Sequence, residues 1–192
     1  MKRGAPPGLF DSGPVLPEGF RYESDFLSTI EEGEVVRHVE ALPFKAFEFQ
    51  GFVGKGRVVS FGWKYDFNER QLQKADDMPE FLLPLRRKAA EWAGLERAAF
   101  QHALVTEYSP GSSIGWHRDK AVFDEVVGVS LLAACDFRIR RKRGGKWERA
   151  RIVAQPRSAY LLSGPSRTEW EHSIPAVDQL RYSITFRNFR GR

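Results

Sequence analysis

Cysteine is almost absent from this sequence of 192 residues, in which Cys135 is the single one. One cysteine excludes a disulfide within the chain, a cysteine-rich zinc site and an iron–sulfur cluster held by this chain alone. No apolar run approaches the roughly 20 residues of a membrane-spanning helix, and the first residues lack the apolar block of a secretory signal. We therefore expect a reducing, cytoplasmic setting, no membrane association, and a buried structural thiol at Cys135.

The remaining composition is typical of a folded protein. Hydrophobic residues make up 42% of the chain and charged residues 29%, which excludes a disordered or fibrous chain. The length fits one domain with a core of its own. We expect a loose N-terminal arm at residues 1–20, where prolines and glycines gather, and a single domain at 21–192.

Positive charge is concentrated in one segment. The chain has 30 lysines and arginines against 25 acidic residues, a formal net charge of +5, but residues 138–151 alone carry +7. A basic cluster on an otherwise nearly neutral chain indicates a polyanionic partner such as nucleic acid. The alternative is a solvated hairpin whose charges only maintain solubility.

Two helices are predicted in the first half of the chain. The sequence Ser-Thr-Ile-Glu at 28–31 is a capping box, and apolar residues at helical spacing continue this helix up to Pro43. The second helix is predicted to begin near Pro79 and to end at Gly94. We expect Pro84 to kink it.

Strands are predicted elsewhere. Residues 46–68 alternate and turn on glycines, which favours short strands. In the second half the strand-like segments are 101–108, 126–139, 149–154, 158–162 and 180–189, with a hairpin turn at Gly144-Gly145. Helices followed by strands predict an α+β, mainly β fold: a barrel or jelly roll with N-terminal flanking helices.

One set of side chains points to metal chemistry. His117 and Asp119 are two residues apart, and on a strand such residues project from the same face, so both can reach one metal ion. His172 is far enough along the chain to arrive from another strand. Two histidines and one carboxylate are the ligands of non-haem Fe(II) oxygenases. The alternative is a chance pattern of histidines that pack or face solvent.

The last predicted strand adds a second signal. Residues 181, 183, 185 and 187 (Arg, Ser, Thr, Arg) share one face of it. Guanidinium groups bind carboxylates through two parallel hydrogen bonds, so Arg181 and Arg187 suit a small dicarboxylate held at both ends. The alternative is a strand with one solvated polar face.

Together, His117-x-Asp119, His172 and Arg181-x5-Arg187 resemble the motif of the AlkB family of Fe(II)/2-oxoglutarate-dependent dioxygenases. The stretches 106–111 and 163–167 are also similar to that family, and the resemblance covers roughly residues 60–190. It implies a double-stranded β-helix (jelly roll), with its core at about 100–190. It implies iron held by His117, Asp119 and His172, and 2-oxoglutarate bound by Thr106, Tyr108, Arg181, Ser183 and Arg187.

The activity that the resemblance implies is oxidative demethylation of alkylated nucleobases, of the DNA-repair type. The reaction would use Fe(II) as a cofactor, consume 2-oxoglutarate and O2, and release formaldehyde, succinate and CO2. The damaged base must leave the stack to enter such a pocket. Trp63 and Tyr65, in a stretch similar to the family's nucleotide-recognition lid at about 46–75, are candidates for clamping that base. Burial in the core is the alternative for both.

The implied partner is nucleic acid, DNA rather than RNA, bound by a monomer. From the charge of the hairpin we expect phosphate contacts at Arg140, Arg141, Lys142 and Arg143. Trp116 and Trp170 are expected to be pocket walls or packing residues, and His102 to be structural.

One departure from the family leaves RNA open. Ala121 stands where DNA-repair members usually carry an acidic residue that contacts the base, and Asp124 or Glu125 would replace it only with a different loop. Two alternatives therefore remain: the same chemistry on methylated RNA or protein, and a non-enzymatic nucleic-acid-binding module. A kinase is excluded, because the required asparagine and glycine-rich loop are absent from the sequence.

Overall fold

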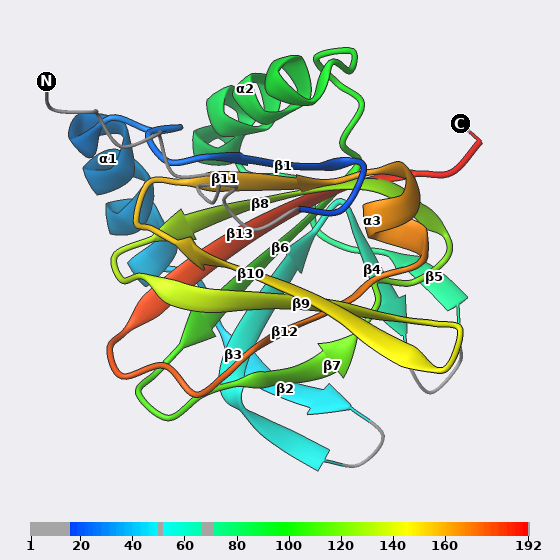
Figure 1. The fold of residues 1–192 in the computed structure, drawn as a ribbon. Helices are drawn as coiled ribbons and strands as arrows, with labels where there is room; N and C mark the ends of the chain where they lie inside the picture. The colour runs from blue at the N-terminus through cyan, green and yellow to red at the C-terminus, as the bar shows by residue number, and fades with distance from the viewer. Residues whose placement is uncertain (1–15, 50–51, 67–70, 192) are drawn as a thin grey trace, which may run out of the picture.

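Strands dominate the computed structural model, which describes residues 16–49, 52–66 and 71–191 (Figure 1). In chain order the elements are β1 (Phe20–Glu23), α1 (Thr29–Glu40), β2 (Lys45–Phe49), β3 (Phe52–Phe61), β4 (Trp63–Asp66), β5 (Gln71–Lys74), the 3-10 helix η1 (Glu80–Leu82), α2 (Leu83–Ala93), β6 (His102–Tyr108), β7 (Ile114–His117), β8 (Phe123–Leu131), β9 (Cys135–Arg143), β10 (Lys146–Ala154), β11 (Ala159–Leu162), α3 (Gly164–Thr168), β12 (Glu171–Ile174) and β13 (Arg181–Phe189).

Two antiparallel sheets form a jelly roll. The larger has the strand order β1-β11-β8-β13-β6-β3-β2, the smaller the order β10-β9-β12-β7, and β4 pairs with β5 beside them. The smaller sheet lies in front of the larger one in Figure 1. The predicted fold class, a mainly β jelly roll with flanking N-terminal helices, is confirmed.

Two apolar cores follow from this layering. In the first, α1 and α2 pack on the outer face of the larger sheet, where Val39, Leu82 and Ile184 are completely buried. In the second, rings and aliphatic side chains of the two sheets meet, among them Phe137 of β9 and Tyr160 of β11 at 4.3 Å between centroids. The space between the sheets is where the polar face of β13 points.

The helices begin and end largely as predicted. Ser28 and Glu31 form the reciprocal capping box at the start of α1, and Gly94 ends α2 in the left-handed conformation (φ 80°). The predicted kink at Pro84 is wrong. This proline lies in the first turn of α2, where its missing N–H has no helical partner to lose.

One predicted strand is two strands. Residues 126–139 were expected to be continuous, but β8 and β9 lie in different sheets, separated by a turn in which Leu132 has a φ of 70°. An apolar run cannot show such a corner, because both strands are buried. The hairpin turn at Gly144-Gly145 is confirmed, with φ values of 55° and 81°.

Three features of the expected layout are not tested. Residues 1–15 lie outside the described part of the chain, so the loose arm stays a prediction, as do the single domain and the lid at 46–75.

Cys135 is buried and free, as expected. None of the helices in the described residues has the length and apolar character needed to cross a membrane.

Candidate active site

The two histidines lie on neighbouring strands of the smaller sheet. His117 ends β7 and is directly paired with His172 of β12, which brings their ring centroids to 4.2 Å. Asp119 lies beyond the end of β7, so the prediction that it shares a strand with His117 is wrong. Its Oδ2 is nevertheless 3.7 Å from Nε2 of His172. Strand pairing and the following turn therefore bring both His117 and Asp119 next to His172.

The chemistry of this donor set fits Fe(II). Nδ1 of His117 donates to the carbonyl of Gly115 at 2.8 Å, which leaves Nε2 available to a metal. Among the described residues, no three His, Cys, Asp or Glu side chains lie close enough together, as they stand, to hold a metal ion. The separation of 3.7 Å between Asp119 and His172 is longer than the roughly 3 Å between neighbouring donors on one ion. Iron binding would therefore require Oδ2 of Asp119 and Nε2 of His172 to move closer together.

Arg187 orients the carboxylate. Its Nε and Nη2 lie 2.7 and 2.6 Å from Oδ1 of Asp119, so Oδ2 is left to face His172. Burial is the largest single effect and would raise the pKa of Asp119, but the nearby charges together, with that of Arg187 the largest, outweigh it and hold that pKa well below its usual range. Burial, followed by the charge of His117, lowers the pKa of His172 to about 3. Asp119 is thus ionised and His172 neutral, as metal ligands must be.

Arg181 is a buried cation that has no acidic partner among the residues that the structure describes. Its side chain has no exposed surface, its Nε donates to Oγ of Ser130 at 3.2 Å, and its Cζ lies 5.0 Å from the ring centre of Tyr108. Within the described part of the chain, Nη1 and Nη2 have no hydrogen-bond partner. Leaving these two amino groups of a buried guanidinium without partners is costly, so they indicate a site for a carboxylate.

The expected co-substrate residues face one another across two strands. In the register of β6 and β13, Tyr108 is opposite Arg181, and Thr106 is opposite Ser183. Arg181 and Arg187 are both buried, so the alternative of a solvated polar face is wrong. The structure thus gathers all five residues, Thr106, Tyr108, Arg181, Ser183 and Arg187, along the strand pair β6–β13. Their role in binding 2-oxoglutarate stays a prediction.

Two neighbours of this strand pair belong to the site although the sequence pattern assigned neither of them to it: His102, expected to be structural, and Ser130. His102 is buried as expected, but its Nδ1 lies 3.4 Å from Nη1 of Arg187. Burial, followed by the charge of Arg187, lowers the pKa of His102 well below its usual value, so it is neutral and accepts this hydrogen bond. Its even spacing from Thr106 on one strand was an available signal. For Ser130 no signal existed, because only the strand register brings it to Arg181.

The candidate base clamp is only half visible. The Trp63 ring is partly exposed and meets Phe189 edge-on at 5.6 Å between centroids. The side chain of Tyr65 lies outside the described residues, so its place beside Trp63 stays a prediction. Trp170 is buried under Arg141, whose Cζ is 4.8 Å from the indole centre, in keeping with a packing role.

Asp124 and Glu125 do not replace the acidic residue missing at Ala121. Asp124 lies 3.7 Å from Arg190, and Glu125 accepts a hydrogen bond of 2.6 Å from Asn188. Both carboxylates therefore lie at the beginning of β8 and are held there by Asn188 of β13 and by Arg190 just after it.

Some of the basic side chains of the β9–β10 hairpin are already paired with acidic residues, and others are exposed. Arg141 lies 2.6 Å from both Glu148 and Glu169, so its charge is already neutralised. Arg140 is paired with Glu171 at 2.8 Å, whereas Lys142 and Arg143 are exposed. Trp116, expected as a pocket wall or packing residue, packs against Arg140 at 4.2 Å.

Comparisons with known proteins agree with this arrangement. The 2OG-Fe(II) oxygenase superfamily matches residues 31–187. The "Alkylated DNA repair protein ALKBH8 homolog" of Arabidopsis thaliana is 24% identical over 96% of this chain and 59% of its own length. The "tRNA (carboxymethyluridine(34)-5-O)-methyltransferase alkbh8" of Xenopus tropicalis is 24% identical over 84% of this chain and 26% of its own length. The chain thus spans less than two thirds of these two relatives.

In two further matches, this chain covers more than two thirds of the length of the other protein. The "DNA oxidative demethylase ALKBH2" of Bos taurus is 26% identical over 97% of this chain and 77% of its own length. The solved structure of OsALKBH1 superposes with a TM-score of 0.71, covering 91% of this chain and 98% of that one, at 17% identity. At that identity the superposition shows the fold alone.

Proposed function

Because the chain belongs to the 2OG-Fe(II) oxygenase superfamily, and within it to the AlkB family, we propose that it oxidatively demethylates alkylated nucleobases in nucleic acid. The superfamily uses Fe(II), 2-oxoglutarate and O2. Bound in this site, they would supply the oxidising power that hydroxylates an N-methyl group, which then leaves as formaldehyde while 2-oxoglutarate becomes succinate and CO2.

The buried guanidinium of Arg181, which has no acidic partner among the described residues, is the observation that carries this proposal. Within the described part of the chain, the two Nη amino groups of the buried Arg181 have no hydrogen-bond partner. At the other end of β13, Arg187 fixes a carboxylate beside two histidines. A metal-dependent oxygenase with a dicarboxylate co-substrate requires both features. A plain binding module has no use for either feature. Both also lie between the sheets, where water is excluded.

Each side chain has one task in this scheme. His117, Asp119 and His172 would hold the iron, with Arg187 keeping Oδ2 of Asp119 turned toward it. Arg181 would bind one carboxylate of 2-oxoglutarate, beside the ring of Tyr108. Thr106 and Ser183 would contact the co-substrate between these two points.

DNA is the polymer that we place first. The bovine relative is named as a DNA oxidative demethylase and covers most of this chain, and the basic hairpin supplies charge for a phosphate backbone. Trp63, partly exposed, would stack on the flipped base. RNA is the second candidate, because the Xenopus relative is named for tRNA and Ala121 lacks the acidic side chain of DNA-repair members.

The test is release of formaldehyde and succinate from a panel of methylated DNA and RNA oligonucleotides. We expect Fe(II)- and 2-oxoglutarate-dependent release with at least one methylated strand. His172→Ala should abolish it, whereas His38→Ala, at an exposed position of α1, should not. Release that continues in the His172 variant, or no release with any methylated strand, contradicts the proposal.

A further inference from the structure

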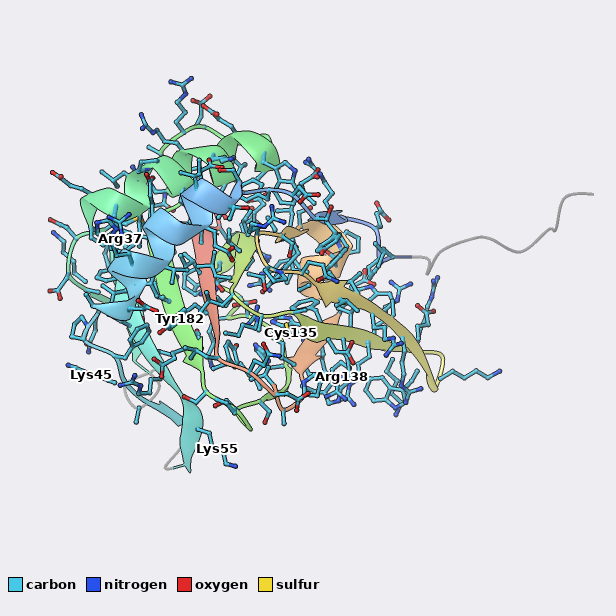
Figure 2. The ribbon with its side chains drawn as sticks, turned by 90° about the vertical axis from the view of Figure 1, so that its left-hand side faces the viewer. Arg37, Lys45, Lys55, Cys135, Arg138 and Tyr182 are labelled. Carbon is cyan, nitrogen blue, oxygen red and sulfur yellow. The ribbon has the colours of Figure 1, made fainter. Side chains whose placement is uncertain are left out.

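The outer face of the smaller sheet carries a row of alternating tryptophans and arginines. His117, Ile139 and His172 point between the sheets, so their strand neighbours point outward. The outward side chains that form the cation–aromatic row are Trp116 of β7, Arg138 and Arg140 of β9, and Trp147 and Arg149 of β10. In Figure 2, Arg138 lies on the opposite side of the molecule from α1 and α2.

Arg140 is held between two indoles. Its Cζ lies 4.2 Å from the ring centre of Trp116 and 4.3 Å from that of Trp147, while its Nε donates to Glu171 at 2.8 Å. Such stacking fixes the plane of the guanidinium. The guanidinium of Arg140 is therefore already ordered before any ligand binds, so binding would cost little further side-chain entropy.

The ends of the cation–aromatic row are still open. Arg138 lies 5.3 Å from the ring of Trp116 and donates to the neutral Ser173. Arg149 lies 6.0 Å from Trp147, and within the described residues neither arginine has an acidic partner. Trp147 is 39% exposed, so an exposed aromatic surface lies beside the cation of Arg149, and the cation of Arg138 lies at the other end of the row.

We propose that the cation–aromatic row binds a single-stranded stretch of nucleic acid beside the reacting base; this rests on the proposed function. Phosphates would contact Arg138 and Arg149, and an unpaired base would stack on Trp147. Aromatic faces are available only to unpaired bases, because in a duplex each base is already stacked on its neighbours.

The position of the row connects it to the candidate active site. Trp116 directly precedes His117, and β7 is the edge strand of the smaller sheet. A strand that follows the row to β7 therefore has only the edge of the sheet to round before it reaches the two histidines. The row belongs to the substrate, with the flanking nucleotides on the outer face and the modified base inside.

The test is the affinity of the whole chain for unmodified oligonucleotides of one sequence, single-stranded and duplex, without iron. We expect Trp147→Ala to weaken single-strand binding about tenfold and to leave duplex binding unchanged. Val153→Ala, on the same strand and face and 45% exposed, is the matched control without effect. Arg149→Gln should lower the salt slope of single-strand binding by about 0.7, and Arg97→Gln, at an exposed arginine near the end of α2, should not.

Three results would overturn the inference: wild-type single-strand affinity in Trp147→Ala, an equal loss for both strand forms, or an unchanged salt slope in Arg149→Gln. Thermal unfolding of each variant shows whether Trp147 merely braces the hairpin. The demethylation assay is independent of this measurement. If the protein demethylates but its binding does not depend on the row, the inference is wrong and the proposed function stands. If single strands bind through the row but no demethylation occurs, the proposed function is wrong and only single-strand binding by the row stands.

Discussion

Arg187 holds a single oxygen of Asp119, Oδ1: its Nε donates a hydrogen bond to that oxygen at 2.7 Å, and its Nη2 lies 2.6 Å from it. The other oxygen, Oδ2, faces Nε2 of His172 at 3.7 Å. One arginine thus decides which carboxylate oxygen is available at the candidate iron site. Against the effect of burial, its charge is also the largest of those that together keep the pKa of Asp119 well below its usual range.

Arg187→Gln should therefore weaken iron binding. Loss of a residue that orients a metal ligand typically lowers metal affinity about 10- to 100-fold, and we expect a higher 2-oxoglutarate requirement as well. Competition for Fe(II) with a chelating dye under anaerobic conditions measures the first effect. Arg190→Gln is the control, because Arg190 pairs with Asp124 outside the site. Equal Fe(II) affinity in the two variants would show that Arg187 does not orient the ligand.

Arg181 leads to an unusual expectation for stability. Because its Nη1 and Nη2 have no partner within the described residues, Arg181→Met should leave the free protein as stable as the wild type or more stable. 2-Oxoglutarate, which binds only the folded state, should raise the melting temperature of the wild type and have no effect on this variant. The measurement is thermal unfolding with and without 2-oxoglutarate. Stabilisation that persists in Arg181→Met would place the co-substrate elsewhere.

Gly128 gives a packing test in the wall of the site. Its strand neighbour Tyr160 lies so close that a methyl group at position 128 would collide with the phenol ring. Gly128→Ala should therefore cost about 1–3 kcal/mol of unfolding free energy. Gly33→Ala, in α1 with open space around it, should instead stabilise by about 0.5–1 kcal/mol. Chemical denaturation measures both.

The double variant Gly128→Ala/Tyr160→Leu separates this collision from other causes. If the ring is the cause, the loss should be smaller than the sum of the two single losses. Additive losses would show that Tyr160 is not what keeps position 128 a glycine.

The ion pair of Glu107 with Arg57, outside the candidate site, should make the stability of the fold depend on pH. Hydrogen bonds from Arg57 at 2.8 and 2.7 Å lower the pKa of Glu107 from its usual 4.5, despite the opposing effect of burial. A depressed pKa stabilises the fold above the unfolded-state value, and that contribution is lost as the pH falls. Between pH 7 and pH 3 the melting temperature of Glu107→Gln should thus fall less than that of the wild type. A parallel decline in both proteins would contradict the assignment.

Residue pattern was sufficient for much of this molecule and insufficient in identifiable places. The capping box at 28–31 and the polar face of β13 depend on local spacing, which the sequence displays directly. Asp119 could not be placed correctly, because whether β7 continues past His117 depends on its pairing with β12. The four-residue strands β1, β7 and β12 are too short for a periodic signal.

Long-range register accounts for the remaining omissions. Ser130 contacts Arg181 only because β8 and β13 pair in one particular register. Arg141 counts as a free cation in the sequence, and only the folded hairpin shows Glu148 and Glu169 neutralising it. Charge density along the chain predicts where a basic surface lies, but partners from other strands decide which of its residues remain available.

The most direct measurement is an anaerobic absorption titration with Fe(II) and 2-oxoglutarate. If His117, Asp119 and His172 hold one iron beside the carboxylate site of Arg181, a weak visible band should appear when both are added and saturate at one iron per chain. The band should be absent in Asp119→Ala and unchanged in Asp124→Asn. No band in the wild type, or the same band in Asp119→Ala, would contradict the account.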